Sequence, residues 1–317
     1  MTIREVNREE FIRHTGSNHG VFVAPGFLNA MGDNVKFHGF FSNKEEWVGG
    51  FVTYRNSLRK IATLSPMPFS PHIGLYLLDI KGSESTVRKR TKDTLKAMAT
   101  YLEAQLEPII YCTFPPEWTD MQPFIWQGFQ VSPRYTYQLR TDRSEEELMA
   151  GLDKGTRNLV RRAEKDGLSA RVAEVEERHF ELVSNTFSRK GIKVDRDALK
   201  TLMTNKEAVH SAFAIEVLQE DNITAVAYCL FDSNSAYYIA GGGDPEHRHQ
   251  SAGTYALWSA ILEAKKRGVE VFDFEGSMVP EIESFFRGFG GEMVTYHQVF
   301  RAPGWARTLL NITGFKP

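Results

Sequence analysis

The chain has 317 residues, of which 42% are hydrophobic and 25% are charged, and its formal net charge is −2. This composition is typical of a soluble globular protein, and the length favours two domains. The first 140 residues carry 16 basic and 13 acidic side chains and the remainder carry 22 and 27, so neither part has the basic excess typical of DNA-binding proteins.

The chain start and the cysteines indicate a cytoplasmic protein. Residues 1–6 are partly charged and lack an apolar leader, and the sequence contains no run of about 18 apolar residues that could cross a membrane. Cys112 and Cys229 both lie in apolar, strand-like stretches, and we expect both to be reduced core thiols.

The sequence of the first half predicts two strands, then a helix, then another strand. The expected elements are a hairpin at 37–41 and 47–54, a helix at 85–106 and a strand at 108–113. The helix follows from apolar residues at helical spacing, Leu95, Met98, Ala99, Leu102 and Leu106. A strand at 134–139 ends before Ser144, which forms a capping box with Glu147 and begins a helix at 145–152. The sequence therefore predicts domains at 1–140 and 141–317.

The second half repeats this order. The expected elements are strands at 223–231 and 236–240, a helix at 254–267, a strand at 269–274, a short helix at 280–287 and a strand at 292–300. The order of elements suggests a duplicated mixed α/β unit. The fold class predicted is α/β (α+β), with a mixed, twisted sheet flanked by helices in each domain.

Four segments resemble the Fem-type (FemAB-like) tandem acetyltransferase-fold family. They are 154–168 (Lys-Gly-Thr-Arg-Asn-Leu-Val-Arg-Arg-Ala-Glu-Lys-Asp-Gly-Leu), 273–276 (Asp-Phe-Glu-Gly), 286–291 (Phe-Arg-Gly-Phe-Gly-Gly) and 122–129 before the strand at 134–139. The resemblance covers the chain from about residue 122 to its end. It implies two GNAT-like domains and transfer of an acyl group to an amine, from acyl-CoA in some relatives and from aminoacyl-tRNA in those that build peptidoglycan cross-bridges.

The loop between the strand at 236–240 and the helix at 254–267 is the predicted donor site. A strand that opens through small residues into a helix N-terminus presents free backbone N–H groups and a positive dipole end to a phosphate. The predicted cofactor-binding residues are Gln250, Ser251, Gly253, Thr254, Gly241 and Gly242. Tyr255 stands where the resemblance implies a small residue, and Phe285 and Phe286 stand where it implies a tyrosine that protonates the leaving group.

Asp273 and Glu275 are the predicted catalytic pair. Two positions apart on one strand, they would project to the same face, where one carboxylate could accept the proton of an attacking ammonium. The alternative is a structural pair that caps loops or meets Arg287. We favour Glu275 as the base because it lies nearer the strand end.

Arg157, Arg161, Arg248, Tyr238 and Tyr255 are the predicted phosphate- and substrate-binding residues. Arg157 and Arg161 are four apart, so they share one helix face that suits a phosphate, although a solvated helix explains them equally well. We expect no metal site, since His247 and His249 have no third ligand nearby.

These observations predict an acyltransferase that uses acyl-CoA as co-substrate and acts directly on an amine, either a small molecule or a cell-wall precursor. Two alternatives stay open: a ligase that takes its acyl group from aminoacyl-tRNA, and a non-catalytic binding module on the same fold. The first predicts tRNA as a partner, and the altered donor loop favours the second.

Overall fold

The computed structural model describes residues 1–317 except 16–18, 59, 79–80, 206–210, 277 and 313–317. The chain divides into two compact units. The first contains residues 1–24, 31–134 and 295–317, and the second contains 25–30 and 135–294. Strands β7 (Gln130–Arg140) and β13 (Glu292–Arg301) each begin in one unit and end in the other.

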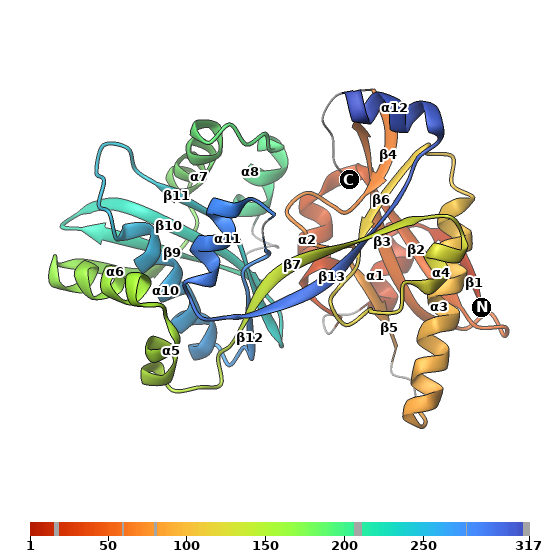
Figure 1. Cartoon of the computed structure of the whole chain (residues 1–317), viewed down its shortest axis with the longest axis horizontal. Helices are drawn as coiled ribbons and strands as arrows, with labels where there is room; N and C mark the ends of the chain where they lie inside the picture. Colours follow the sequence, from red (N-terminus) through yellow and green to blue (C-terminus); the bar gives the residue numbers. More distant parts are fainter. Residues whose placement is uncertain (16–18, 59, 79–80, 206–210, 277, 313–317) are drawn as a thin grey trace. The chain divides into compact units, whose positions relative to one another are not determined.

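The first unit is a mixed sheet with helices (Figure 1). Its elements are β1 (Thr2–Val6), α1 (Arg8–Thr15), η1 (Val21–Val23), η2 (Gly32–Asn34), β2 (Val35–Phe41), β3 (Trp47–Leu58), β4 (Ile61–Ser65), β5 (Leu75–Leu77), α3 (Glu84–Glu103), β6 (Ile109–Thr113), α4 (Gln122–Trp126) and α12 (Gly304–Ile312). The strand order is β1-β2-β3-β4-β6-β13, with β5 on β3. Strands β4 and β6 run parallel, and their neighbours pair antiparallel.

Helix α3 forms the core of the first unit with the sheet. Its buried side chains include Leu95, Met98 and Leu102, which join Phe40 and Phe51 in one apolar cluster. The predicted helix is therefore confirmed, but it ends at Glu103 and leaves Leu106 95% exposed. The helix closes at the C-cap residue Ala104, whose backbone N–H donates to the carbonyl oxygens of Thr100 and Leu102.

The second unit repeats the mixed arrangement. Its elements are α2 (Pro25–Ala30), α5 (Glu145–Gly151), α6 (Lys154–Lys165), β8 (Leu168–Ala173), α7 (Glu177–Arg189), α8 (Arg196–Thr204), β9 (Ala212–Gln219), β10 (Asn222–Phe231), β11 (Ser235–Gly243), α10 (Ala252–Lys266), β12 (Val271–Asp273) and α11 (Pro280–Arg287). The strand order is β7-β12-β11-β10-β9-β8, in which only the β11–β12 pair is parallel within the described residues.

Helix α10 anchors the second unit because it is apolar on almost every side. Its buried residues include Leu257, Trp258 and Ile261, and they belong to the same cluster as Phe272 and Phe274. The sheet lies between α7 and α8 on one face and α6 and α10 on the other (Figure 1). The capping box at Ser144 forms as predicted, and both cysteines are free and buried.

The division into units differs from a single cut after residue 140. The segment 295–317 groups with the first unit, because β13 pairs with β6 from Gln298 opposite Thr113 to Arg301 opposite Ile110. Phe300 and the α12 residues Ala306 and Leu310 then complete a small apolar cluster with Ile109. The short helix α2 groups with the second unit, where it contacts α8. No helix in the described ranges is long and apolar enough to cross a membrane.

Candidate active site

The parallel strands β11 and β12 separate in the second unit. Their pairing runs from Ser235 opposite Val271 to Tyr237 opposite Asp273, where β12 ends, whereas β11 continues to Gly243. Past Tyr237, the described pairing of β11 is with β10 alone. One edge of β11 therefore has backbone groups that an extended ligand could bind by strand addition.

A cavity of about 530 Å³ lies where β11 leaves its neighbour. It is lined by Thr186, Arg189, Lys190, Thr224, Ala225, Val226, Tyr238, Gly241, Gly242, Gly243, Asp244, Arg248, His249, Gln250, Ala252, Gly253 and Phe285. Six predicted site residues thus meet in one cavity: Tyr238, Gly241, Gly242, Arg248, Gln250 and Gly253.

Cations surround the cavity from two directions. Arg189 and Lys190 lie at the C-terminal end of α7, and Arg248 lies in the loop before α10. The guanidinium of Arg189 donates to the carbonyl oxygen of Gly243 at 2.7 Å and so joins α7 to the end of β11. Lys190 and Arg248 are exposed. Together with the N-terminus of the 15-residue helix α10, these charges suit an anionic ligand such as a diphosphate.

The loop before α10 is held by side-chain hydrogen bonds. The backbone N–H of Ser251 donates to Nδ1 of His249 at 3.2 Å, which leaves Nε2 as the protonated nitrogen that donates to Asp166 at 3.1 Å. Arg162 donates to the side-chain oxygen of Gln250 at 3.1 Å. The loop therefore has a defined conformation, tied to α6 and its C-cap residue Asp166.

Residues at the start of α10 differ in their access to the cavity. Gly253 lines it, and a Cβ at this position would have no heavy atom within 4 Å. Ser251 and Thr254 are buried and do not line the cavity. The hydroxyl of Ser251 has no hydrogen-bond partner among the described residues and does not cap the helix.

The glycine run serves packing as well as access. A Cβ at Gly242 would lie 2.6 Å from the backbone carbon of Leu182 and the nitrogen of Val183, so glycine permits α7 to pack against β11. A Cβ at Gly241 would collide with the hydroxyl oxygen of Tyr238. The close neighbour of Gly242 is therefore the backbone of helix α7.

Tyr238 presents its hydroxyl at the cavity wall. Its ring packs edge-on against Phe286 of α11, with the ring centroids 5.8 Å apart. Burial raises the pKa of Tyr238 well above its usual value, and the nearby Cys229 raises it further. The neutral phenol is thus favoured, and the group is suited to donating a hydrogen bond rather than to releasing its proton.

Asp273 is saturated by hydrogen bonds. Its carboxylate accepts from Thr136 at 2.6 Å, from the side-chain amide of Gln138 at 2.8 Å and from the backbone N–H of Glu275 at 2.7 Å. Burial raises the pKa of Asp273, and these hydrogen bonds lower it. The bonds to Thr136 and Gln138 tie β12 to β7, which favours the structural alternative for this residue.

Glu275 lies beyond the strand, because β12 ends at Asp273. The prediction that both carboxylates project to the same face of one strand was therefore wrong. Glu275 has a left-handed backbone with φ 59°, a conformation uncommon outside glycine. Its Oε1 is buried without a hydrogen-bond partner among the described residues. Burial raises the pKa of Glu275 well above its usual range, and the negative charge of Asp273 raises it further.

Five further predicted residues do not line the cavity: the catalytic pair Asp273 and Glu275, and Arg157, Arg161 and Tyr255. Arg157 donates to the carbonyl oxygen of Leu152 at 3.1 Å, Arg161 is exposed on α6, and Tyr255 packs at the edge of the second unit's core. The sequence analysis predicted no helix at 177–189, and it overlooked Arg189 and Lys190. Among the described residues, no group of three His, Cys, Asp or Glu side chains is placed to hold a metal ion.

Comparisons with known proteins agree with this geometry. Residues 150–281 match the family described as "Acetyltransferase (GNAT) domain". Among solved structures, FemX superposes with a TM-score of 0.64 at 14% identity, covering 98% of this chain and 99% of FemX. A search of curated protein sequences found no significant match.

Two other solved structures have the same fold over nearly the whole chain. L-PGS from Bacillus licheniformis has a TM-score of 0.58 at 14% identity, with 98% of each chain covered. A tandem GNAT protein from the clavulanic acid biosynthesis pathway has a TM-score of 0.52 at 12% identity, with 95% of this chain and 97% of that chain covered. The predicted tandem GNAT fold of FemAB-like proteins is thereby confirmed.

Proposed function

We propose that this chain, a tandem GNAT-fold protein with a GNAT-family domain at residues 150–281, is an N-acyltransferase that takes its acyl group from acyl-CoA. One observation carries the proposal. The cavity combines the free edge of β11, the N-terminus of α10 and the cations Arg189, Lys190 and Arg248. A donor with an extended arm and a diphosphate matches all three features.

The free edge of β11 would hold the donor and polarise its carbonyl group. An extended pantetheine arm can pair with the backbone groups past Tyr237, where β12 no longer occupies that edge. A backbone N–H directed at the thioester oxygen would stabilise the negative charge that develops when the amine attacks. The amine nitrogen then bonds to the carbonyl carbon, the C–S bond breaks, and no covalent enzyme intermediate forms.

The reaction needs a hydrogen bond to the leaving sulfur and a base for the amine. Tyr238 lines the cavity and suits the first role, and Glu275, which does not line the cavity, is the predicted residue for the second. The hydroxyl of Tyr238, which burial keeps in its neutral form, donates a hydrogen bond to the leaving thiolate, which then takes its proton from the solvent. The attacking ammonium must lose a proton, and we assign this step to Glu275 in its ionised form. A raised pKa brings this carboxyl closer to the pKa of an amine and makes it a stronger base.

The acceptor is an amine, either a small molecule or a cell-wall precursor. Aminoacyl-tRNA stays the second candidate donor because exposed cations of α6, Lys154, Arg161 and Lys165, lie outside the cavity lining and would suit a larger polyanion. Both donors place phosphates near a helix N-terminus, so binding measurements must separate them.

Calorimetric titration with acetyl-CoA, free CoA and tRNA tests the proposal. We expect micromolar binding of CoA, weakened about fivefold by Lys190→Ala and by Arg248→Ala, since each removes a charge-assisted contact worth about 1 kcal/mol. Lys266→Ala is the matched control, because Lys266 is exposed at the far end of α10 and does not line the cavity.

Two other outcomes would favour the alternative functions. Binding of tRNA without CoA, with activity lost on ribonuclease treatment, would replace acyl-CoA by aminoacyl-tRNA as the donor. If neither ligand binds, the enzyme proposal fails and the binding-module alternative takes its place.

A further inference from the structure

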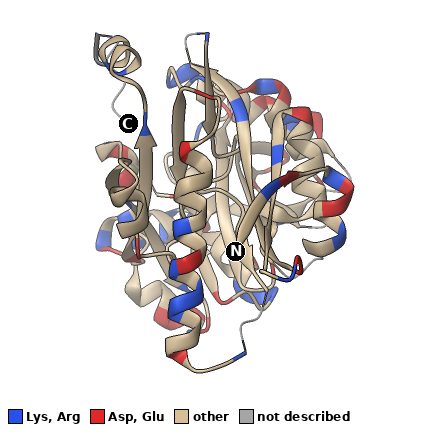
Figure 2. Cartoon of the chain, turned by 90° about the vertical axis from the view of Figure 1, so that its right-hand side faces the viewer, with Lys and Arg blue, Asp and Glu red and all other residues tan. Residues whose placement is uncertain are grey.

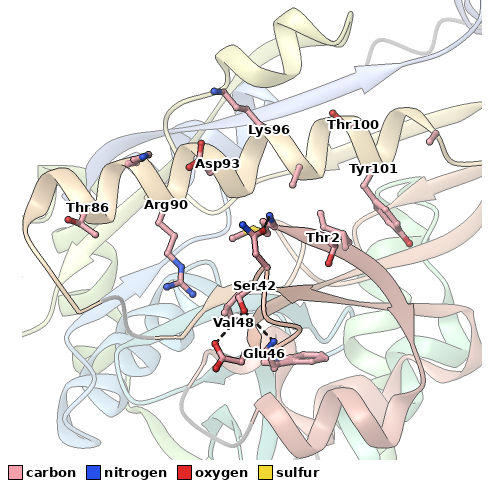
Figure 3. Close-up of a pocket in the computed structure, with 17 residues that line it drawn as sticks. Thr2, Ser42, Glu46, Val48, Thr86, Arg90, Asp93, Lys96, Thr100 and Tyr101 are labelled. Atoms are coloured by element: carbon pink, nitrogen blue, oxygen red, sulfur yellow. Dashed lines mark hydrogen bonds between the residues drawn. The ribbon is translucent and has the colours of Figure 1, made fainter.

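A second, larger hollow lies in the first unit and shares no lining residue with the cavity of the candidate active site. It measures about 1230 Å³ and runs between α3, strand β1 and the turn from β2 to β3. The lining residues are Met1, Thr2, Ile3, Ser42, Asn43, Glu46, Trp47, Val48, Thr86, Lys89, Arg90, Asp93, Lys96, Ala97, Thr100, Tyr101 and Ala104. We call it the α3 groove; Figure 3 shows its side chains.

The α3 groove is long. Its lining follows one face of α3 from Thr86 to Ala104, which corresponds to about 27 Å along a helix. An extended peptide of about eight residues spans that length. The volume also exceeds the roughly 300–1,000 Å³ of most small-molecule sites, so the dimensions favour a chain-like ligand over a compact one.

The cations of the groove have no carboxylate partners among the described residues. Lys89, Arg90 and Lys96 appear in no ion pair, whereas their neighbours Arg88 and Lys92 pair with Glu84 and Asp120. Figure 2 shows Lys and Arg gathered over the first half of α3, close to the N-terminus of the chain. Lys96 points away from Ser42 and Glu46 in Figure 3, and its ammonium lies 6.0 Å from the ring centroid of Trp126. Lys89 and Arg90 are therefore the cations available to a ligand.

Arg90 is the most informative of these cations. It is half-buried, and in Figure 3 its side chain extends from α3 into the groove toward Ser42 and Glu46. The other half-buried arginines in the described part of the first unit all have hydrogen-bond partners: Arg8, Arg134 and Arg301. A half-buried guanidinium has lost part of its hydration, and a carboxylate from a ligand would restore its hydrogen bonds.

Two carboxylates also line the groove. Asp93 lies on α3, and Glu46 accepts from the hydroxyl of Ser42 at 3.3 Å. With three cationic side chains against two carboxylates, the side chains that line the groove carry one positive charge in excess. The mixture favours a ligand whose acidic groups are spaced along a chain, meeting Lys89 and Arg90 and avoiding Asp93, over a uniformly charged polyanion.

Strand β1 supplies a backbone edge beside this charge. It is the terminal strand of the sheet and pairs with β2 from Thr2 opposite Phe41 to Val6 opposite Phe37. Its other edge has no strand partner in the described ranges, and its first residues line the groove. An exposed edge of this kind accepts an extended segment by main-chain hydrogen bonding.

We propose that the α3 groove docks an extended acidic segment of a partner protein, which adds to the edge of β1 and places carboxylates against Lys89 and Arg90. The edge supplies affinity through the backbone, and the cations of α3 supply specificity for acidic side chains. This interaction is independent of the acyl-transfer site, because every lining residue belongs to the first unit.

Fluorescence anisotropy on the full chain tests the proposal. The probe is a labelled eight-residue peptide that alternates threonine with glutamate, compared with peptides that carry glutamine or lysine at the same positions. We expect the glutamate peptide to bind about tenfold or more tightly than the glutamine peptide, as for charge pairs in interfaces. The double substitution Lys89→Glu with Arg90→Glu should abolish this preference and transfer it to the lysine peptide.

Two controls separate docking from general charge effects. Arg88→Glu changes the charge of the same helix outside the groove lining and should alter affinity less than about twofold, as for an exposed charge. Two peptides are methylated at alternate backbone nitrogens, one at the odd-numbered residues and the other at the even-numbered residues. Only one of them should fail to bind, because only one of the two sets of N–H groups faces β1. The second control uses the unaltered protein, so it does not depend on the folding of a variant.

Several results would overturn the proposal. They are equal binding of the glutamate and glutamine peptides, tight binding of the glutamate peptide by the doubly substituted protein, and unchanged binding of both methylated peptides. Competition by free glutamate or inorganic phosphate at the same concentration as the peptide would indicate a small-anion site. Tighter binding of an oligonucleotide of similar length would indicate a nucleic-acid surface.

Discussion

Glu275 is the residue at which local structure and chemistry conflict most. It has a left-handed backbone, and its Oε1 is buried without a described partner beside a second carboxyl group. Its backbone N–H supports Asp273, which keeps three hydrogen bonds and therefore bears the negative charge of the pair more readily. Such an arrangement costs stability, which is typical of functional positions.

Replacing Glu275 by glutamine should stabilise the protein at neutral and alkaline pH. The folded-state pKa is raised, so between the unfolded and folded pKa values only the folded state keeps the proton. Stability of the natural protein should then fall as pH rises, by up to about 1.4 kcal/mol per pH unit. The difference in melting temperature between Glu275→Gln and the natural protein should grow with pH above about 4.5 and level off above the folded pKa.

The matched comparison is Glu281→Gln, which alters an exposed carboxylate in the first turn of α11. The difference in melting temperature between Glu281→Gln and the natural protein should change little over the same pH range. A pH-independent difference for Glu275→Gln as well would show that Glu275 titrates normally, and the assignment of this residue as base would lose its physical basis.

Tyr238→Phe should lower turnover about a hundredfold while the Kd of CoA changes little, since the change removes only the hydrogen-bond donor that stabilises the leaving thiolate. The loss should be smaller for a thioester whose thiol has a low pKa, because such a leaving group depends less on this hydrogen bond. Steady-state rates with donors of differing thiol pKa measure this. Tyr255→Phe is the control, because Tyr255 does not line the cavity. An equal loss of turnover in Tyr238→Phe with thioesters of high and of low thiol pKa would contradict the role of Tyr238.

At the scale of elements, the cavity depends on how closely α7 packs against β11. Gly242 lets the backbone of Leu182 and Val183 approach, and the guanidinium of Arg189 joins the end of α7 to Gly243. The same packing places Arg189 and Lys190 at the cavity. Gly242, which the packing of α7 on β11 requires, therefore also determines where Arg189 and Lys190 lie at the cavity.

Gly242→Ala should destabilise the protein by roughly 1–3 kcal/mol, since the new methyl group overlaps backbone that cannot rotate away. It should also weaken CoA binding, because α7 must move outward with its cations. Gly253→Ala is the contrasting change: its methyl group meets open space in a helix and should stabilise the fold by up to about 1 kcal/mol. Denaturant unfolding and calorimetry on both variants separate folding from binding, and a stable Gly242→Ala variant with normal affinity would refute the packing argument.

The sequence predicted these elements better than their contacts. The spacing of Leu95, Met98 and Leu102 defined α3, because apolar periodicity is a local property. The end of β12 at Asp273 and the left-handed turn at Glu275 were missed, since both depend on pairing with β7, more than 130 residues earlier in the chain. Arg189 was missed because only the packing of α7 on β11 places it in the cavity.

At the scale of the whole molecule, the chain ends in the unit where it began. A cut after residue 140 assigns β13 and α12 to the C-terminal domain, as sequence order alone suggests. The contacts assign 295–317 to the first unit because β13 pairs with β6. Phe300, which is 3% exposed, packs there with Ile109 and Leu310.

Phe300→Ala should therefore destabilise the first unit, by about 3–5 kcal/mol for a buried phenylalanine, although the residue lies near the C-terminus. Hydrogen exchange followed by mass spectrometry should show lost protection in β4 and β6, whereas β9, β10 and β11 should exchange as before. CoA affinity should be kept, because the cavity belongs to the second unit. Phe272→Ala, in the other core, should give the reverse pattern, since each unit buries its own apolar cluster and opens locally according to its own stability. Loss of protection in β9–β11 from the Phe300 substitution would assign the C-terminal segment to the second unit, as the sequence order suggested.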